Sequence, residues 1–169
     1  MVAGGLVWLM VSESRALARS NKQLADSAAP RDDSAQTFAQ ISDALTVAKK
    51  DHKQVLLQFG GHGCTWCHLL ETLFKTDQRI AGELEKDFVV VLVDVSSNEN
   101  NGNNKGVRDK YGNPDRDGVP VTVFLDSDGK QLLAENIAFA DKEAQKHKIA
   151  RVDPDKVLAF LKKVAGKST

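Results

Sequence analysis

Apolar residues recur at helical spacing in some segments of this chain and form short continuous runs in others. Between residues 34 and 50 they return every three to four positions, which predicts an amphipathic helix with one face on a sheet. A second helix is predicted near the C-terminus, where Asp153 can cap the first turn and Pro154 can occupy its first position. The apolar stripe of the first helix consists of Phe38, Ile41, Leu45 and Ala48.

Shorter apolar runs predict strands between these helices. Residues 55–59 form one such run, and residues 88–95 form a nearly unbroken β-branched run, as expected of a central strand covered on both faces. Residues 121–125 form a third run, which the tight turn at 126–129 connects to a hairpin partner at 130–135.

The resulting order is helix, strand, helix, strand, helix, strand, strand, helix. This alternation predicts an α/β fold with a mixed central sheet flanked by helices. A chain of 169 residues with 41% apolar residues can form one globular domain whose core needs no structural disulfide. The sequence has no stretch of about 20 apolar residues that would span a bilayer.

The first 33 residues differ in character from the rest. Residues 2–11 are apolar and have the length of a signal-peptide core, and Ala16-Leu17-Ala18 offers a small-x-small cleavage site, although the usual basic start is missing. Residues 19–33 are polar and form a linker. We therefore expect a signal-like segment and linker over 1–33, a folded domain over 34–169, and a periplasmic or extracytoplasmic location, with the cytoplasm as the alternative.

Two cysteines, the only ones in the chain, stand in the segment Cys64-Thr65-Trp66-Cys67. A loop at 60–63 precedes them and residues 66–76 read as a helix. Free backbone N–H groups and the positive dipole end of a helix stabilise a thiolate in its first turn. The pattern indicates dithiol chemistry, with Cys64 as the nucleophile that forms a mixed disulfide and Cys67 as the thiol that resolves it.

Two histidines flank the pair and offer further interpretations. An imidazolium at His62 or His68 would lower the pKa of Cys64. A zinc site built from His62, Cys64, Cys67 and His68 is a second possibility, although four ligands within seven residues would be cramped.

The segment from Cys64 to His68 also fits the Cys-x-x-Cys-His signature of covalent haem attachment. His68 would then be one axial ligand and a methionine the usual second one. The only methionines are Met1 and Met10, in the N-terminal segment, so His52 or His147 would have to substitute.

Several motifs together resemble the thioredoxin superfamily over residues 34–165, and in particular the exported or membrane-associated bacterial thioredoxin-like proteins. They are the strand that leads into the cysteine pair, Tyr111-Gly112 ahead of Gly118-Val119-Pro120, and the strand that follows at once. The resemblance implies a thioredoxin fold and a thiol-disulfide oxidoreductase activity.

The resemblance also implies a substrate groove. Pro120 would be the cis-proline that faces the dithiol, and Val119 would offer its backbone to extended substrate segments. An ordinary trans turn proline is the alternative for Pro120, although X-Pro is the bond at which cis is cheap. We expect Trp66, Val119 and Pro120 to bind substrate.

The chain departs from the thioredoxin pattern at the site. Gly63 replaces the tryptophan before the first cysteine, and Trp66 replaces the small residue or proline before the second. Gln58 replaces the buried acid that helps to deprotonate the resolving cysteine, and a neutral amide is no base. We therefore expect slow attack by Cys67, which relies on water, a nearby residue or His68. An unchanged rate in Gln58→Glu would refute this expectation.

Two polar segments are longer than in thioredoxin. Residues 96–118 contain six asparagines and should form a surface loop that leads into a short helix at 107–111. Calcium ligands can be imagined there, but the Asp-x-Asx-x-Asx-Gly pattern is missing. Residues 136–152 should present an exposed helical face. The imagined calcium ligands are Asn98, Glu99, Asn100, Asp115 and Asp117, and the exposed face would carry Lys142, Glu143, Lys146 and Lys148.

The charge balance limits the partners. The chain has 23 basic and 23 acidic residues, which argues against nucleic acid or an anionic membrane surface. We expect a monomer without metal or organic cofactor, whose partners are cysteine-containing substrate proteins and a redox partner protein with a dithiol. The leading alternative is a binding or metal-delivery module that uses the two cysteines and two histidines.

Overall fold

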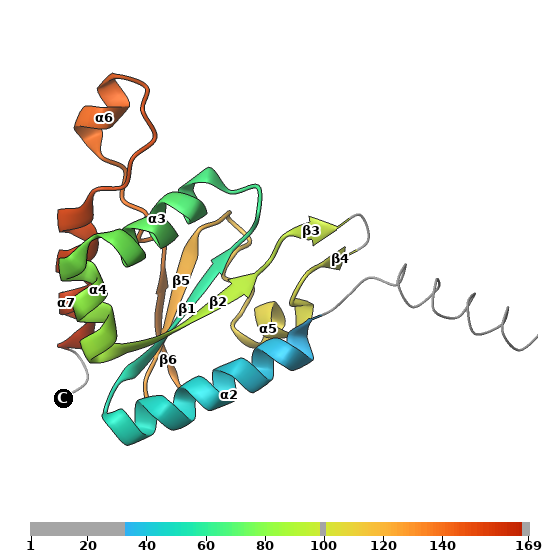
Figure 1. Cartoon of the computed structure of the whole chain (residues 1–169). Coiled ribbons are helices and arrows are strands. Elements are labelled where there is room, and N and C mark those ends of the chain that lie inside the picture. Colours follow the sequence, from blue (N-terminus) through green and yellow to red (C-terminus); the bar gives the residue numbers. More distant parts are fainter. Residues whose placement is uncertain (1–32, 99–100, 167–169) are drawn as a thin grey trace, which may run out of the picture. The chain divides into compact units, whose positions relative to one another are not determined.

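The computed structural model describes residues 33–98 and 101–166, and its central element is a four-stranded sheet (Figure 1). Strand β1 (Gln54–Gly60) pairs in parallel with β2 (Phe88–Asp94) and antiparallel with β5 (Val121–Leu125). Strand β6 (Gln131–Glu135) completes the sheet antiparallel to β5. The strand order is β2-β1-β5-β6, so the predicted mixed sheet is confirmed.

Helices cover both faces of this sheet (Figure 1). Helices α2 (Ser34–Asp51) and α5 (Lys105–Lys110) contribute to one hydrophobic core. Helices α3 (Thr65–Thr76), α4 (Gln78–Asp87) and α7 (Pro154–Ala165) contribute to the core on the opposite face. The predicted α/β fold with helices on both faces of the sheet is therefore confirmed.

Strand β1 is buried along its whole length. Its side chains alternate between the faces, as those of a strand must, so that Val55, Leu57 and Phe59 join the α2 core while Leu56 joins the other. Gln58 follows the same alternation and points toward the face that carries α3. The strand therefore places one buried amide beneath the helix that begins at the cysteine pair.

The prediction for residues 88–95 was wrong in one respect. Strand β2 lies at an edge of the sheet within the part of the chain that the structure describes, and its pairing ends at Asp94. Val90 and Leu92 are 38% and 49% exposed. An unbroken apolar run is expected in a covered central strand, but the same residue types also suit an edge strand whose helices cover it only in part.

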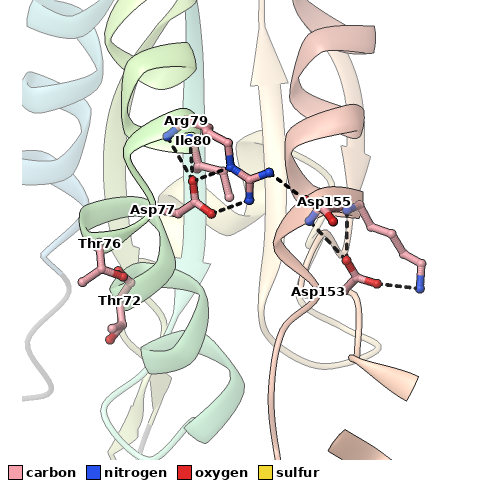
Figure 2. A network of polar contacts seen from close by, with 8 residues as sticks. Thr72, Thr76, Asp77, Arg79, Ile80, Asp153 and Asp155 are labelled. Carbon is pink, nitrogen blue, oxygen red and sulfur yellow. Dashed lines mark hydrogen bonds and ion pairs between the residues drawn. The ribbon is translucent and has the colours of Figure 1, made fainter. Parts of the chain in front are cut away.

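Helix α4 was not predicted from the sequence. Helix α3 ends at Thr76, and the Asp77 carboxylate then caps α4 by accepting bonds from the backbone N–H groups of Arg79 and Ile80. Figure 2 shows the Arg79 guanidinium between Asp77 and Asp155, with N–O distances of 2.7 and 2.8 Å. This bridge joins the first turns of α4 and α7.

The C-terminal helix was predicted correctly. Asp153 caps α7, and Pro154 is its first residue. Figure 2 shows the Asp153 carboxylate that accepts bonds from the backbone N–H groups of Asp155 and Lys156, both at 3.2 Å.

The long polar segments contain more structure than predicted. Strands β3 (Ser97–Asn98) and β4 (Asn101–Gly102) pair within the asparagine-rich loop, and α5 starts before the predicted 107–111 helix. Helix α6 (Lys142–Lys146) forms within the second polar segment, with Lys142, Glu143 and Lys146 exposed as expected. Lys148 lies beyond the helix, in a left-handed conformation.

The predicted signal-like segment and most of the linker lie outside the described residues, so these expectations stay predictions. Among the residues that the structure does describe, no helix is long and apolar enough to cross a membrane.

Candidate active site

Cys64 and Cys67 are joined by a disulfide at the start of α3. Their Cα atoms are 5.2 Å apart. Cys64 is the extended residue that caps α3, and its Sγ accepts a 3.1 Å hydrogen bond from the backbone N–H of Cys67. The predicted position of the pair is confirmed. Because a helix N-terminus presents unpaired N–H groups, the sulfur of Cys64 lies where negative charge is favoured.

The two sulfurs lie in different surroundings. Cys64 is partly exposed, whereas Cys67 is 0% exposed. Gly60, the last residue of β1, lies directly against Cys67, since a Cβ added there would be 3.1 Å from its Sγ. A side chain at this position would press against Cys67.

An open groove of about 740 Å³ runs beside Cys64. It brings together Cys64, Trp66 and Val119, three of the residues that the sequence analysis assigned to the site. The Val119–Pro120 peptide bond is cis, and Pro120 itself is buried at the start of β5. The residues that line the groove are Gly61, Gly63, Cys64, Thr65, Trp66, Val95, Ser96, Asp115, Gly118 and Val119.

A partly buried ion pair holds the loop that carries Val119. The Arg108 guanidinium Nε lies 2.8 Å from Asp115 Oδ2, and the Asp115 side chain is only 6% exposed. From the sequence, Asp115 was considered only as an imagined calcium ligand. The structure instead gives it a cationic partner on α5, and this partner ties the groove wall to that helix.

A second cavity, of about 200 Å³, lies beside the end of β1, and Cys67 itself is not among the residues that line it. Gly60, which contacts Cys67, is one of its walls. The three residues predicted to tune the thiol pKa all line it, together with two carboxylates that the sequence analysis did not assign. They are Gln58, His62, His68, Glu71 and Asp94, with Gly61, Leu92 and Val93.

Both polar atoms of the Gln58 side chain are hydrogen-bonded within the fold. Its Oε1 accepts a 2.7 Å bond from the Thr122 hydroxyl, and its Nε2 donates to the Phe59 carbonyl at 3.3 Å. The residue is 1% exposed. The thioredoxin acid position is therefore occupied by a neutral amide that is held by a neighbouring hydroxyl.

Both histidines face partners other than Cys64. His62 Nδ1 lies 3.4 Å from Asp94 Oδ2, and the His62 backbone N–H donates to the Ser96 hydroxyl at 3.0 Å. His68 Nε2 lies 2.8 Å from the His62 carbonyl, which can only accept, so this nitrogen carries a proton. Among the described residues, neither imidazole is hydrogen-bonded to Cys64.

The Asp94 carboxylate is held by several donors. Ser96 donates to Oδ1 through its hydroxyl at 2.6 Å and its backbone N–H at 2.9 Å. Partial burial acts to raise the pKa of Asp94, but these two bonds and the nearby His62 outweigh burial and hold the pKa below its usual range. Asp94 therefore stays ionised. The sequence places Asp94 near the end of a predicted strand, but it does not indicate that Ser96 and His62 are its partners.

The described part of the chain does not bring together the ligands that a metal site would need. Within residues 33–98 and 101–166, no three histidine, cysteine or acidic side chains form a group that could hold a metal ion. For haem, Met1 and Met10 lie outside the described residues, while His52 and His147 end α2 and α6.

Comparisons with known proteins match this geometry. A family model described as thioredoxin-like matches residues 36–127. The chain is similar to a disulphide isomerase from Xylella fastidiosa Temecula1, with 30% identity over 80% of this chain and 95% of that one, and a TM-score of 0.62. A thioredoxin from Thermus thermophilus shares the fold at 22% identity, over 75% of this chain and 85% of that one, with a TM-score of 0.53. None of the curated proteins compared with the chain matches it.

Proposed function

The chain belongs to the thioredoxin-like family and is a thiol-disulfide oxidoreductase, and from this premise we propose that Cys64 attacks substrate and Cys67 resolves the mixed disulfide. The observation that carries this assignment is the difference in exposure, because Cys64 lines the open groove and Cys67 is 0% exposed. A substrate sulfur reaches Cys64 first.

The exchange then proceeds in two steps. The Cys64 thiolate attacks one sulfur of a substrate disulfide, forms a mixed disulfide and releases the other substrate sulfur as a thiolate. Cys67 loses its proton and attacks Cys64 Sγ. The Cys64–Cys67 bond forms, the second substrate thiolate leaves and takes up a proton, and the substrate is reduced by two electrons. The reverse sequence oxidises a substrate dithiol.

The groove favours an extended polypeptide as substrate. Val119, Gly118 and Trp66 line the same hollow as Cys64. The Val119 backbone would pair with the substrate chain, as strands add to an exposed edge, and the Trp66 ring would contact its side chains. Pro120 follows as the buried residue that shapes the wall. The substrates would be cysteine-containing proteins.

A second dithiol protein would restore the redox state after each turnover. Residues 2–11 support an extracytoplasmic location, where disulfide chemistry is common. The protein would act there as a monomer, with residues 1–33 as signal-like segment and linker. Protease protection in intact cells, compared with lysed cells, tests this location.

An insulin disulfide reduction assay tests the activity. The wild type should turn over, Cys64→Ser should not, and Cys67→Ser should accumulate the mixed disulfide. Stoichiometric binding in a metal titration, without turnover, would favour the metal-delivery function instead. The equilibrium reduction potential of the Cys64–Cys67 pair then decides whether the protein mainly reduces or oxidises its substrates.

A further inference from the structure

The second step of the proposed exchange needs a proton acceptor for Cys67. A thiol attacks only as thiolate, and burial in apolar surroundings disfavours that charged form. Cys67 is 0% exposed, and Gln58, which lines the second cavity together with Gly60, is a neutral amide. The Gln58 oxygen is already bonded to Thr122. The base must therefore come from elsewhere in the second cavity.

Glu71 is the carboxylate in the right place. It lies four residues after Cys67 on α3, and residues at this spacing are neighbours on one helix face. Long helical side chains lean toward the helix N-terminus, which brings Glu71 over the turn of Cys67. Glu71 lines the second cavity together with Gly60, which contacts Cys67.

We propose that Glu71 accepts, through water in the second cavity, the proton that Cys67 loses as it attacks the mixed disulfide. This inference rests on the proposed roles of the two cysteines. The cavity volume of about 200 Å³ accommodates several water molecules. In the mixed disulfide the Cys64–Cys67 bond is open, and the Cys67 thiol then passes its proton to water of this cavity, which passes a proton to the Glu71 carboxylate. The sulfur keeps the electron pair that forms the new disulfide.

Other groups in and near the cavity are less suited. Asp94 is occupied by Ser96 and His62, which hold its pKa low and make it a weak base. His68 follows Cys67 directly and so does not share its helix face, and its Nε2 is held by the His62 carbonyl. Within the described residues, the Glu71 carboxylate has neither a hydrogen bond nor an ion pair.

The charged and titratable groups that face Glu71 influence how readily it accepts a proton. His62 from the loop after β1 and His68 from α3 line the cavity with it, as does the Asp94 carboxylate from β2. Lys75 lies one turn further along α3 and is exposed. Glu71 therefore shares its surroundings with one anion and up to three cations.

The test follows the reduced full chain during its reaction with dithiobis(nitrobenzoate). Attack by Cys64 releases a first coloured thiolate, and resolution by Cys67 releases a second. In Glu71→Gln we expect an unchanged first release and a second release that is about tenfold slower near neutral pH, as is typical for loss of a general base. The matched control is Glu85→Gln, which removes an exposed carboxylate from α4. It should leave both rates unchanged.

The pH dependence separates a proton acceptor from a packing effect. As the pH rises toward that at which the buried Cys67 thiol ionises without a base, the rates of wild type and Glu71→Gln should converge. An equal slowing at every pH, or no slowing near neutral pH, would overturn the proposal, as would a slowing in His68→Gln but not in Glu71→Gln. Absence of the first release in the wild type would instead contradict the proposed function.

Discussion

The two cysteines of this protein belong to one helix turn but face two different regions. Cys64 opens onto a groove whose other wall is the loop before β5. Cys67 is enclosed by β1 and borders the part of the site that contains the second cavity. One side is an open groove beside Cys64, and the other gathers titratable side chains around a smaller hollow.

The difference indicates a division of labour between the two regions. On the proposed function, the groove side would control which disulfide reaches Cys64. The cavity side would control how readily Cys67 gives up its proton and therefore how long a mixed disulfide persists. Substitutions on one side should change one step of the exchange and leave the other step nearly unaffected. The following predictions test this separation.

The largest expected difference is in alkylation of the reduced protein. Cys64 should react with iodoacetamide at least about a hundredfold faster than Cys67 near neutral pH, because its thiolate is exposed and stabilised by the helix N-terminus. Mass spectrometry of peptides after timed quenching measures both rates. Unfolding in urea supplies the control, since the two rates should then approach each other. Similar rates in the folded protein would remove the basis of the comparison.

A pair of glycines tests the same contrast through packing. A Cβ at Gly60 would lie 3.1 Å from Cys67 Sγ, whereas a Cβ at Gly63 would meet nothing within 4 Å. Gly60→Ala should therefore lower the free energy of unfolding by about 1–3 kcal/mol and slow resolution by Cys67. Gly63→Ala should leave stability nearly unchanged. Denaturant unfolding and the two-step thiolate release measure these effects, and equal costs for both variants would contradict the prediction.

Much of this fold was predictable from the sequence because its signals are local. The spacing in α2 predicted that helix, and the Asp153-Pro154 start predicted α7. The tight turn after β5 predicted its hairpin with β6. The position of β2 was not predictable in this way, because exposure of Val90 and Leu92 depends on which strands and helices lie beside them.

The site was predictable in part for the same reason. The spacing of Cys64 and Cys67 and the segment ending in Pro120 are local motifs. The pairing of Arg108 with Asp115 and the cavity position of Glu71 depend on elements that meet only in the folded chain. No sequence signal identified Glu71, since an acidic residue on a helix usually faces solvent.

Gln58→Glu sharpens the contrast by adding a second carboxylate beside Cys67. Because Glu71 acts through water, a closer base should still accelerate resolution by a few fold, and by more in a Glu71→Gln background. The same change should lower stability by about 1–3 kcal/mol, because a buried carboxylate can still accept from the Thr122 hydroxyl but can no longer donate to the Phe59 carbonyl.

The matched control for this variant lies on the same strand. Gln54 is 3% exposed and sits at the other end of β1. Gln54→Glu should also lower stability but leave the second thiolate release unchanged. An unchanged rate in Gln58→Glu would show that deprotonation of Cys67 does not limit resolution.

The smallest effect is expected for Ser96→Ala, which removes the hydroxyl that holds Asp94 in the cavity wall. Loss of this bond should raise the pKa of Asp94 toward its ordinary value of 3.8. A lowered pKa in the folded state stabilises the protein above that ordinary value, and this stabilisation is lost as the pH falls through the folded-state pKa. Ser96→Ala should therefore be less stable than wild type by no more than about 1 kcal/mol near neutral pH, since the group is partly exposed. The difference should shrink in acid.

Urea unfolding near neutral pH and in acid measures this difference in stability. Ser127→Ala is the control, and its effect should not vary with pH. A difference that grows in acid would contradict the assignment of Asp94.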